Sequence, residues 1–472
     1  MKKVLYILVI LIVAYVISII VLHRKIDRWE WDETMTENLK FPKDFIWGTA
    51  SASYQVEGGH GIEDSWGWWE TQKKPDGTPR VEGKNGIGND EWNKYMQDIE
   101  NMKLLGVDSY RFSISWSKIE PQKGVINEEA LAHYDLLIND LLKNNIIPMI
   151  TLHHFSHPTW FEKIGAFDKE ENSTHFVNFA KIVFERYADR VKLWATFNEP
   201  VVYAYGRHID LNHPNPYQEA DFNRLGIMLK NTLIAHDEVY KTCKVLPNGK
   251  TAKIGIVKSM MQMDPYSTYD LGDQIMAYYA DKLFLKSYLN YFEKGVFDFQ
   301  AFPVGADVVY QNKNNVGKNL DFTGLNYYSH NAFNFEWTTF DIDKASKPLY
   351  YPGEIHTDLD YGFYPEGLYR AIREISVLNK PIYITENGIG VGPEREELRQ
   401  KHLKTALYDV NKALKEGYDV RAYYYWSLND NFEWDLGFSK KFGLFSVDRN
   451  TLERKPKKTA LLFKSYIKNS RE

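Results

Sequence analysis

Short apolar runs and longer amphipathic stretches alternate along the chain after Phe41. Eight runs rich in β-branched and aromatic residues are typical of strands covered on both faces, and they lie at 45–55, 107–116, 146–155, 192–200, 252–260, 321–329, 381–388 and 420–428. Between them, apolar residues recur at spacings of three and four, and several of these stretches end at Gly or Asn, as helices do. The pattern predicts eight strand–helix units.

Eight such units favour a single α/β domain folded as a (β/α)8 barrel, or TIM barrel, over an open sheet. No Gly-rich phosphate loop follows the first strand, which argues against a dinucleotide-binding fold. The sequence contains no repeat of 20–50 residues and no low-complexity segment. We therefore expect one barrel domain over residues 41–472.

The first 40 residues have a different pattern. The nineteen residues from Val4 to Leu22 carry no charge and lie between basic residues at both ends. As a helix they would span about 28 Å, close to the thickness of a bilayer core. A secretory signal peptide is the alternative, but the apolar region is longer than usual and no small-x-small cleavage site follows it. We expect a transmembrane signal anchor over residues 1–25 and a polar tether over residues 26–40.

This interpretation would place the barrel outside the cytoplasm, on a single-pass membrane protein. The basic residues that flank both ends of the apolar stretch leave the orientation open.

Composition narrows the possible partners. The net charge of −5 comes without a clustered basic face, so we expect no nucleic acid partner. Cys243 is the only cysteine, which excludes an intrachain disulfide and a Cys-based metal site. The aromatic content of 15% leaves more aromatic residues than a core of this size needs, and such a surplus suits the binding of hydroxylated rings.

Polar and aromatic residues stand at the ends of the predicted strands. In a barrel the C-terminal ends of the strands meet at one mouth, where the active site lies. Glu199 and Glu386 end the fourth and seventh strands, so we expect them to face the same mouth. Two carboxyl groups across a cleft suit the cleavage of a glycosidic bond. The same pair could hold a divalent cation, but no third acid stands at a neighbouring strand end, and we expect no metal.

Sequence motifs in the same order along the chain strengthen this interpretation. They are "GTASASYQVEGG", "YRFSISWSKIEP", "LHHF", "TFNEP", "GLNYYS", "ITENG" and "YWSLNDNFEWDLGFSKKFGLFSVD". With them the chain resembles glycoside hydrolase family 1, the β-glucosidase and β-galactosidase family, from about Phe41 to about Ser465. The resemblance implies a (β/α)8 barrel that cleaves β-glycosides with retention of configuration, without metal or cofactor.

The resemblance also implies roles for individual residues. Glu199 would be the acid/base and Glu386 the nucleophile, and Arg111 would lower the pKa of Glu386. Asn198 would bind the sugar 2-hydroxyl. The residues expected to contact substrate are Gln55, His154, Asn198, Asn326, Tyr328, Trp426, Glu433 and Trp434.

Two positions bear on the substrate. Family members that act on 6-phosphorylated sugars replace the acid at Glu433 and use a Lys and a Tyr for the phosphate, whereas Phe442 stands here where that Tyr would be. We therefore expect an unphosphorylated β-D-glycoside. Phe155 stands where the family often has Trp, and it lacks the indole N–H donor. Glucose, galactose, fucose and mannose all remain open.

The leading hypothesis is a membrane-anchored retaining β-glycosidase. A membrane-associated transglycosylase using the same two glutamates is one alternative, and a catalytically inactive binding module is another, although it would be expected to lack one carboxylate. Trp66, Trp68 and Trp69 are either a platform for an extended substrate or packing of a barrel lid. The long connection at 334–358 is expected to shape the aglycone entrance.

Overall fold

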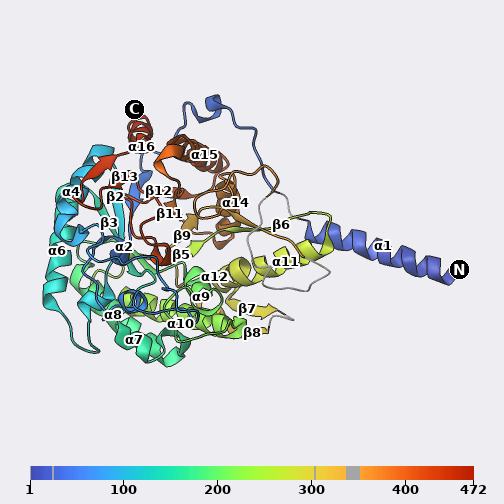
Figure 1. Cartoon of the computed structure of the whole chain (residues 1–472), viewed down its shortest axis with the longest axis horizontal. Helices are drawn as coiled ribbons and strands as arrows, with labels where there is room; N and C mark the ends of the chain where they lie inside the picture. The colour runs from blue at the N-terminus through green and yellow to red at the C-terminus, as the bar shows by residue number, and fades with distance from the viewer. Residues whose placement is uncertain (1, 24–25, 302–304, 336–350, 472) are drawn as a thin grey trace.

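The computed structural model describes residues 2–23, 26–301, 305–335 and 351–471. Within them, the eight predicted strands form a closed parallel barrel in the order β1-β12-β11-β9-β5-β4-β3-β2, which confirms the predicted fold class (Figure 1). The strands are β1 (Ile46–Ala50), β2 (Ser109–Ser113), β3 (Ile147–His153), β4 (Leu193–Asn198), β5 (Lys253–Ser259), β9 (Phe322–Tyr327), β11 (Ile382–Asn387) and β12 (Val420–Trp426).

Helices surround the barrel (Figure 1). The longer ones are α4 (Glu91–Leu105), α6 (Glu128–Lys143), α8 (Ser173–Tyr187), α9 (Pro200–His208), α10 (Phe222–Val245), α11 (Leu271–Asp281), α12 (Ser287–Lys294), α14 (Gly367–Ile375), α15 (Glu396–Lys415) and α16 (Lys458–Asn469). Their ends follow local chemistry. The Asn127 side chain caps α6 by accepting from the amides of Glu129 and Ala130. Gly106 ends α4 in the left-handed conformation that glycine adopts at low cost.

Shorter elements complete the fold. They are the short helices α2 (Ser53–Val56), α3 (Ser65–Trp69), α5 (Trp116–Ile119) and α7 (Thr159–Lys163), the π-helix η4 (Lys282–Lys286), and the strands β6 (Gln262–Pro265), β7 (Val296–Ala301), β8 (Ala306–Gln311), β10 (His330–Phe333), β13 (Phe445–Val447) and β14 (Arg454–Pro456). There are also the 3₁₀ turns η1 (Glu33–Thr36), η2 (Ala166–Asp168), η3 (Glu170–Asn172), η5 (Lys313–Asn315), η6 (Ser376–Leu378), η7 (Pro393–Arg395) and η8 (Trp434–Leu436). The pairs β7–β8 and β13–β14 are antiparallel and lie outside the predicted strands.

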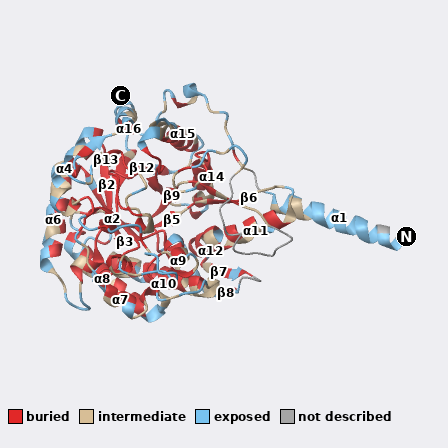
Figure 2. Ribbon diagram, in the orientation of Figure 1, coloured by how far each residue is buried: buried red, intermediate tan, exposed pale blue. Residues whose placement is uncertain are grey.

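The barrel wall is deeply buried (Figure 2). Every residue of β2, β4, β9 and β11 is buried, and this set includes the charged side chains of Arg111 and Glu386. Buried charges are retained in a core only where they are paired and hydrogen-bonded. The fold therefore concentrates costly polar groups at the strand ends that the sequence singles out.

The apolar N-terminal stretch forms the helix α1 (Lys2–Leu22), and its large apolar side chains are mostly exposed (Figure 2). It extends away from the body of the molecule beside α11 (Figure 1), where the Tyr15 hydroxyl donates to the carbonyl of Tyr269. In the part of the chain that the structure describes, no helix has both the length and the apolar character needed to cross a bilayer. The structure thus gives no support to the predicted anchor at residues 1–25 or to the membrane localisation derived from it.

The segment predicted to be a tether, residues 26–40, packs on the barrel. The Trp29 indole donates to Asp409 (3.0 Å), the Trp31 indole donates to Glu366 (3.0 Å), and Arg28 pairs with Glu354 (3.1 Å). These contacts join the segment to α14, α15 and the connection before α14. The expectation of a polar tether did not include the hydrogen bonds that the indole N–H groups of Trp29 and Trp31 make to buried carboxylates.

Candidate active site

Glu386 lies in β11 and is held by two donors. Arg111 of β2 donates to its Oε1 (2.6 Å), and the Tyr328 hydroxyl donates to its Oε2 (2.6 Å). Arg111 is itself fixed, since its Nε donates to Thr151 and its Nη2 to the side-chain oxygen of Asn198 (2.7 Å). A carboxylate with a charged donor on one oxygen and a hydroxyl on the other has a defined orientation.

Glu199 lies where β4 meets α9, and it is 7% exposed. Its φ of 39° is in the left-handed region, which non-glycine residues rarely adopt and which is enriched at functional sites. Its backbone N–H donates to the carbonyl of Val257 (2.9 Å), and its Oε1 accepts from the amide of Asn326 (3.0 Å). Among the described residues, the side-chain amide of Asn326 is thus the only hydrogen-bond donor to the Glu199 carboxyl.

Asn326 connects the two acids. Its Cα pairs with that of Glu386 in the β9–β11 register, and its side chain donates both to Glu199 and to Asn198 Oδ1 (3.1 Å). The Asn326 oxygen accepts from the Thr385 hydroxyl (2.7 Å), so its amide orientation is determined by its neighbours. The two carboxyl groups therefore converge at one place, as the barrel geometry predicts.

The environments of the acids separate their protonation states. Burial raises the pKa of Glu199 to about 8, and the neighbouring Glu386 adds to this shift. Burial also raises the pKa of Glu386, but Arg111 and the Tyr328 hydroxyl oppose it there. Of the two, Glu199 is therefore the group that retains a proton near neutral pH. Arg111 lowers the pKa of Glu386, as the sequence predicts, but burial outweighs this effect and the net shift is upward.

An aromatic wall stands beside the acids. The ring of His154 lies 5.6 Å from that of Trp426 and 5.9 Å from that of Trp434, with both pairs near parallel. Phe155 packs on Trp434 at 5.1 Å. Phe155 and Trp434 have φ values of 65° and 51°, so backbone strain occurs here as well as at Glu199. Aromatic rings held in this way suit the apolar faces of a sugar ring.

Two polar groups beside this wall have no partner among the residues that the structure describes. Asn198 Nδ2 contacts His154 Nε2 (3.0 Å), and because the amide is a donor, the proton of neutral His154 lies on Nδ1. Within the described ranges, that Nδ1 has no hydrogen-bond partner, and neither does Gln55 Oε1. Gln55 donates through its other atom, Nε2, to Glu433 (3.1 Å). A buried unpaired donor and acceptor are costly unless a ligand such as a hydroxylated sugar satisfies them.

Burial also changes the interpretation of Glu433. It raises the pKa of Glu433 to about 8, with Glu386 adding to the shift. The carboxyl is then largely neutral near pH 7, so Glu433 repels a phosphosugar less strongly than an ionised carboxylate would. The ammonium of Lys440, seven residues further along the chain, donates to the backbone carbonyl of Asp358 (2.7 Å).

The structure describes the three tryptophans and part of the predicted entrance connection. Trp66 and Trp69 are buried, Trp68 is half-buried, and the Trp66 ring lies 4.9 Å from that of Trp434, so packing and not an exposed platform explains Trp66 and Trp69. Most of the predicted entrance connection, residues 336–350, lies outside the described residues. Among those described, no group of three His, Cys, Asp or Glu side chains is arranged to hold a metal ion.

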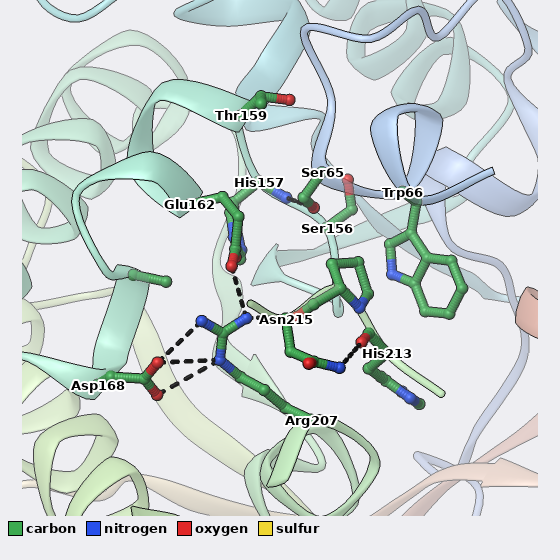
Figure 3. A network of polar contacts seen from close by, with 12 residues as sticks. Ser65, Trp66, Ser156, His157, Thr159, Glu162, Asp168, Arg207, His213 and Asn215 are labelled. Atoms are coloured by element: carbon green, nitrogen blue, oxygen red, sulfur yellow. Dashed lines mark hydrogen bonds and ion pairs between the residues drawn. The ribbon is translucent and has the colours of Figure 1, made fainter. Parts of the chain in front are cut away.

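A buried cluster of charged side chains around Arg207 was not predicted from the sequence. Arg207 of α9 contacts Glu162 and Asp168 there, from the connection that follows β3 (Figure 3). A sign of it in the sequence is the charged pair Arg207-His208 at the end of an otherwise apolar stretch, but that sign does not identify the partners.

Comparisons with known proteins agree with this geometry. The sequence profile described as "Glycosyl hydrolase family 1" matches residues 37–472. Beta-glucosidase A of Thermotoga maritima is 30% identical over 91% of this chain and 98% of its own length. A 6-phospho-beta-galactosidase of Clostridium acetobutylicum is 33% identical over 91% of this chain and 97% of its own length.

Solved structures give the same match. A beta-glycosidase from Pyrococcus horikoshii superposes with a TM-score of 0.80 at 34% identity, and the match covers 92% of this chain and 96% of that one.

Proposed function

Because the chain belongs to glycosyl hydrolase family 1, and is therefore a glycoside hydrolase, we propose that it is a retaining enzyme for terminal, unphosphorylated β-D-glycosides of the β-glucosidase or β-galactosidase type. One observation carries the proposal. Glu199 and Glu386 converge through Asn326, while only Glu386 has a cation and a hydroxyl on its carboxylate. Two acids with opposite protonation states are the requirement for general acid and nucleophile.

In the first step, Glu386 attacks the anomeric carbon and Glu199 gives its proton to the glycosidic oxygen. The bond from carbon to the leaving oxygen breaks, and a glycosyl ester of Glu386 forms. The charge on Glu386 is lost in this step, so one cause of the raised pKa of Glu199 disappears. Glu199 then favours its carboxylate form.

In the second step, the Glu199 carboxylate takes a proton from water while that water attacks the anomeric carbon. The ester bond breaks and the Glu386 carboxylate returns to Arg111 and Tyr328. Two displacements at one carbon retain its configuration. Retention requires the two carboxyl groups to lie about 5–5.5 Å apart, which stays a prediction for this site.

The unpaired atoms near the wall support a sugar as the ligand. His154 Nδ1 can donate to one hydroxyl and Gln55 Oε1 can accept from another. Asn198 Nδ2 is the donor proposed for the 2-hydroxyl, and Trp426 and Trp434 are proposed to contact the ring.

An unphosphorylated sugar is favoured by Glu433 and Phe442. A carboxyl group that bonds Gln55 and Asn431 offers acceptors to sugar hydroxyls and adds no positive charge for a phosphate. Matched hydrolysis rates for 4-nitrophenyl β-galactoside and its 6-phosphate test this point. A faster rate with the phosphorylated substrate would refute the preference.

Membrane attachment is not part of the proposal, because no described helix meets the requirement for a span. Transfer to an alcohol in place of water uses the same intermediate and is measured in the same assay, as the fraction of sugar recovered on the acceptor.

The test is substitution of the proposed nucleophile. Glu386→Gly should lower hydrolysis of a 2,4-dinitrophenyl β-glycoside on the order of 10⁵-fold, and added azide should restore turnover as the α-glycosyl azide. The control is Glu91→Gln, a buried carboxyl bonded to Tyr110 and outside the mouth. Full activity in Glu386→Gly, or a β-azide product, would contradict the assignment.

A further inference from the structure

A cluster of charged side chains is centred on Arg207, which is fully buried. Figure 3 shows Arg207 between Glu162 and Asp168. Its Nη1 donates to Glu162 of α7 (2.8 Å), and its Nη2 and Nε donate to Asp168 of η2 (2.8 and 3.2 Å). Both carboxylates belong to the connection after β3, whereas Arg207 belongs to α9, the helix after β4. One guanidinium thus joins two successive connections on the active-site side of the barrel.

Further contacts extend the cluster. Asp168 also accepts from His208 (2.9 Å) and from the Tyr217 hydroxyl (2.8 Å), and Arg207 donates to the carbonyl of Pro214. Burial opposes the ionisation of Asp168, yet Arg207 and these hydrogen bonds hold its pKa below the usual value. The residues from Arg207 to Tyr217 are therefore held against the preceding connection by an ionised carboxylate.

The cluster is also connected to the segment that carries Phe155 of the aromatic wall. Glu162 contacts His157 Nε2 (3.0 Å) through its second oxygen, and His157 Nδ1 contacts His153 Nε2 (3.2 Å) at the end of β3. His157 follows Phe155 by two residues. The segment that carries the strained Phe155 backbone is thus bonded to the same carboxylate as Arg207.

Glu199 and Arg207 lie at opposite ends of α9. Glu199 immediately precedes α9, and Arg207 lies near the other end of that helix, about 12 Å away along its axis. No side-chain hydrogen bond caps the helix at Glu199, whose backbone is strained. A helix that is strained at one end needs the other end fixed, and two carboxylates on one guanidinium fix it with direction as well as charge.

We propose that Arg207 is a positioning residue that aims the acid/base Glu199 at the glycosidic oxygen by holding α9 against the connection after β3. The proposal rests on the proposed function. Arg207 is fully buried and bonded to protein groups on its three nitrogens, so it is not placed to touch substrate. Its effect should therefore appear in the proton transfers of Glu199 and not in the attack by Glu386.

The leaving group separates these two effects. A dinitrophenolate leaves without a proton, so its glycosides should react with Glu386 almost normally in Arg207→Met. Methyl and disaccharide glycosides need the proton, and their kcat/KM should fall on the order of 10²-fold, the loss expected for a misplacement of about 1 Å. Azide should speed turnover of the dinitrophenyl substrate and yield the β-glycosyl azide, because it attacks the ester without needing a base.

Two further variants and a matched control accompany Arg207→Met. Arg207→Lys keeps the charge but loses the two-pronged geometry, so its loss should be intermediate. Asp168→Asn should reproduce the leaving-group dependence if Arg207→Met does not fold. The control, Arg454→Met, removes a different buried arginine from its ion pair with Asp98. It should lower the melting temperature with an equal effect on all leaving groups.

The possible outcomes are distinct. A loss of kcat/KM that is equal for dinitrophenyl and methyl glycosides, in whichever of the variants folds, would overturn the positioning role. If the wild-type enzyme itself cleaves no β-glycoside, the proposed function fails, and this result is seen before any variant is compared.

Discussion

The two glutamates at the barrel mouth are held in different ways. Glu386 lies within β11, and its two oxygens are bound by an arginine of the non-adjacent strand β2 and by a tyrosine directly after the adjacent strand β9. Glu199 lies outside its strand, in a left-handed conformation at the start of a helix, and one amide binds it. Identical side chains therefore receive charge stabilisation in one case and little more than burial in the other.

The difference shows how one barrel can give two glutamates different catalytic roles. A nucleophile must be ionised and fixed along one line of attack, which Arg111 and Tyr328 provide for Glu386. An acid/base must gain and lose a proton within one turnover, so a strong charged partner would lock it in one state. The strand–helix junction supplies burial without such a partner. The following predictions test this contrast, beginning with the largest effect.

Glu199→Gln should separate substrates by leaving group more strongly than any other change. For methyl glycosides kcat/KM should fall on the order of 10³- to 10⁴-fold, because the general acid is lost. For 2,4-dinitrophenyl glycosides the first step should remain close to normal, as a pre-steady-state burst would show. An α-configured azide product from this variant would mean that the two roles are reversed.

Arg111→Met should lower kcat/KM about 10²- to 10³-fold for all leaving groups alike, because the charge partner of Glu386 is removed from a buried site. The rate of covalent labelling of Glu386 by a 2-fluoro glycoside should fall in parallel. A loss confined to poor leaving groups would show that Arg111 serves Glu199 instead.

Tyr328→Phe should have a smaller effect of the same kind, roughly 10- to 30-fold, since one hydrogen bond to an ionised group is lost while Arg111 remains. The same labelling rate measures it. Tyr327→Phe is the matched control, because that hydroxyl donates to the carbonyl of Tyr364 and not to either acid.

The strand pattern predicted the barrel and the meeting of the residues at its strand ends, because the periodicity and residue types of a strand are local features of the sequence. Periodicity and residue type identify each strand, and parallel closure forces all strand ends to one mouth. Glu199, Asn326 and Glu386 could therefore be brought together on paper although they lie far apart in sequence.

Features that depend on distant partners could not be predicted in the same way. The docking of Trp29 and Trp31 depends on which carboxylates α14 and α15 present to them. The pairing of Arg207 with Asp168 depends on how two loops meet. The direction of the pKa shift at Glu386 depends on the depth of burial, which a sequence does not contain.

The pH dependence of kcat/KM should reflect Glu199, the acid without a charged hydrogen-bond partner. Glu199 must be protonated for the first step, so kcat/KM for a methyl glycoside should fall as the pH rises through about 8. Just above this value the loss per half pH unit is only about two- to threefold. Glu199→Gln should remove this limb, and a limb that persists would assign it to another group, such as Glu433.

The pH dependence of stability should distinguish the two acids by its size. The folded-state pKa of Glu199 is raised above its unfolded value, so its contribution to stability is present below about pH 4.5 and is lost as the pH rises through about 8. Glu199→Gln avoids that loss, and its melting temperature relative to wild type should be higher at pH 8 than at pH 5. Burial also raises the pKa of Glu386, so Glu386→Gln should change in the same direction but by less, because Arg111 and Tyr328 oppose the shift there. Glu397→Gln, on the exposed face of α15, is the control. Equal changes for both active-site variants between pH 5 and pH 8 would show that the two environments differ less than their contacts indicate.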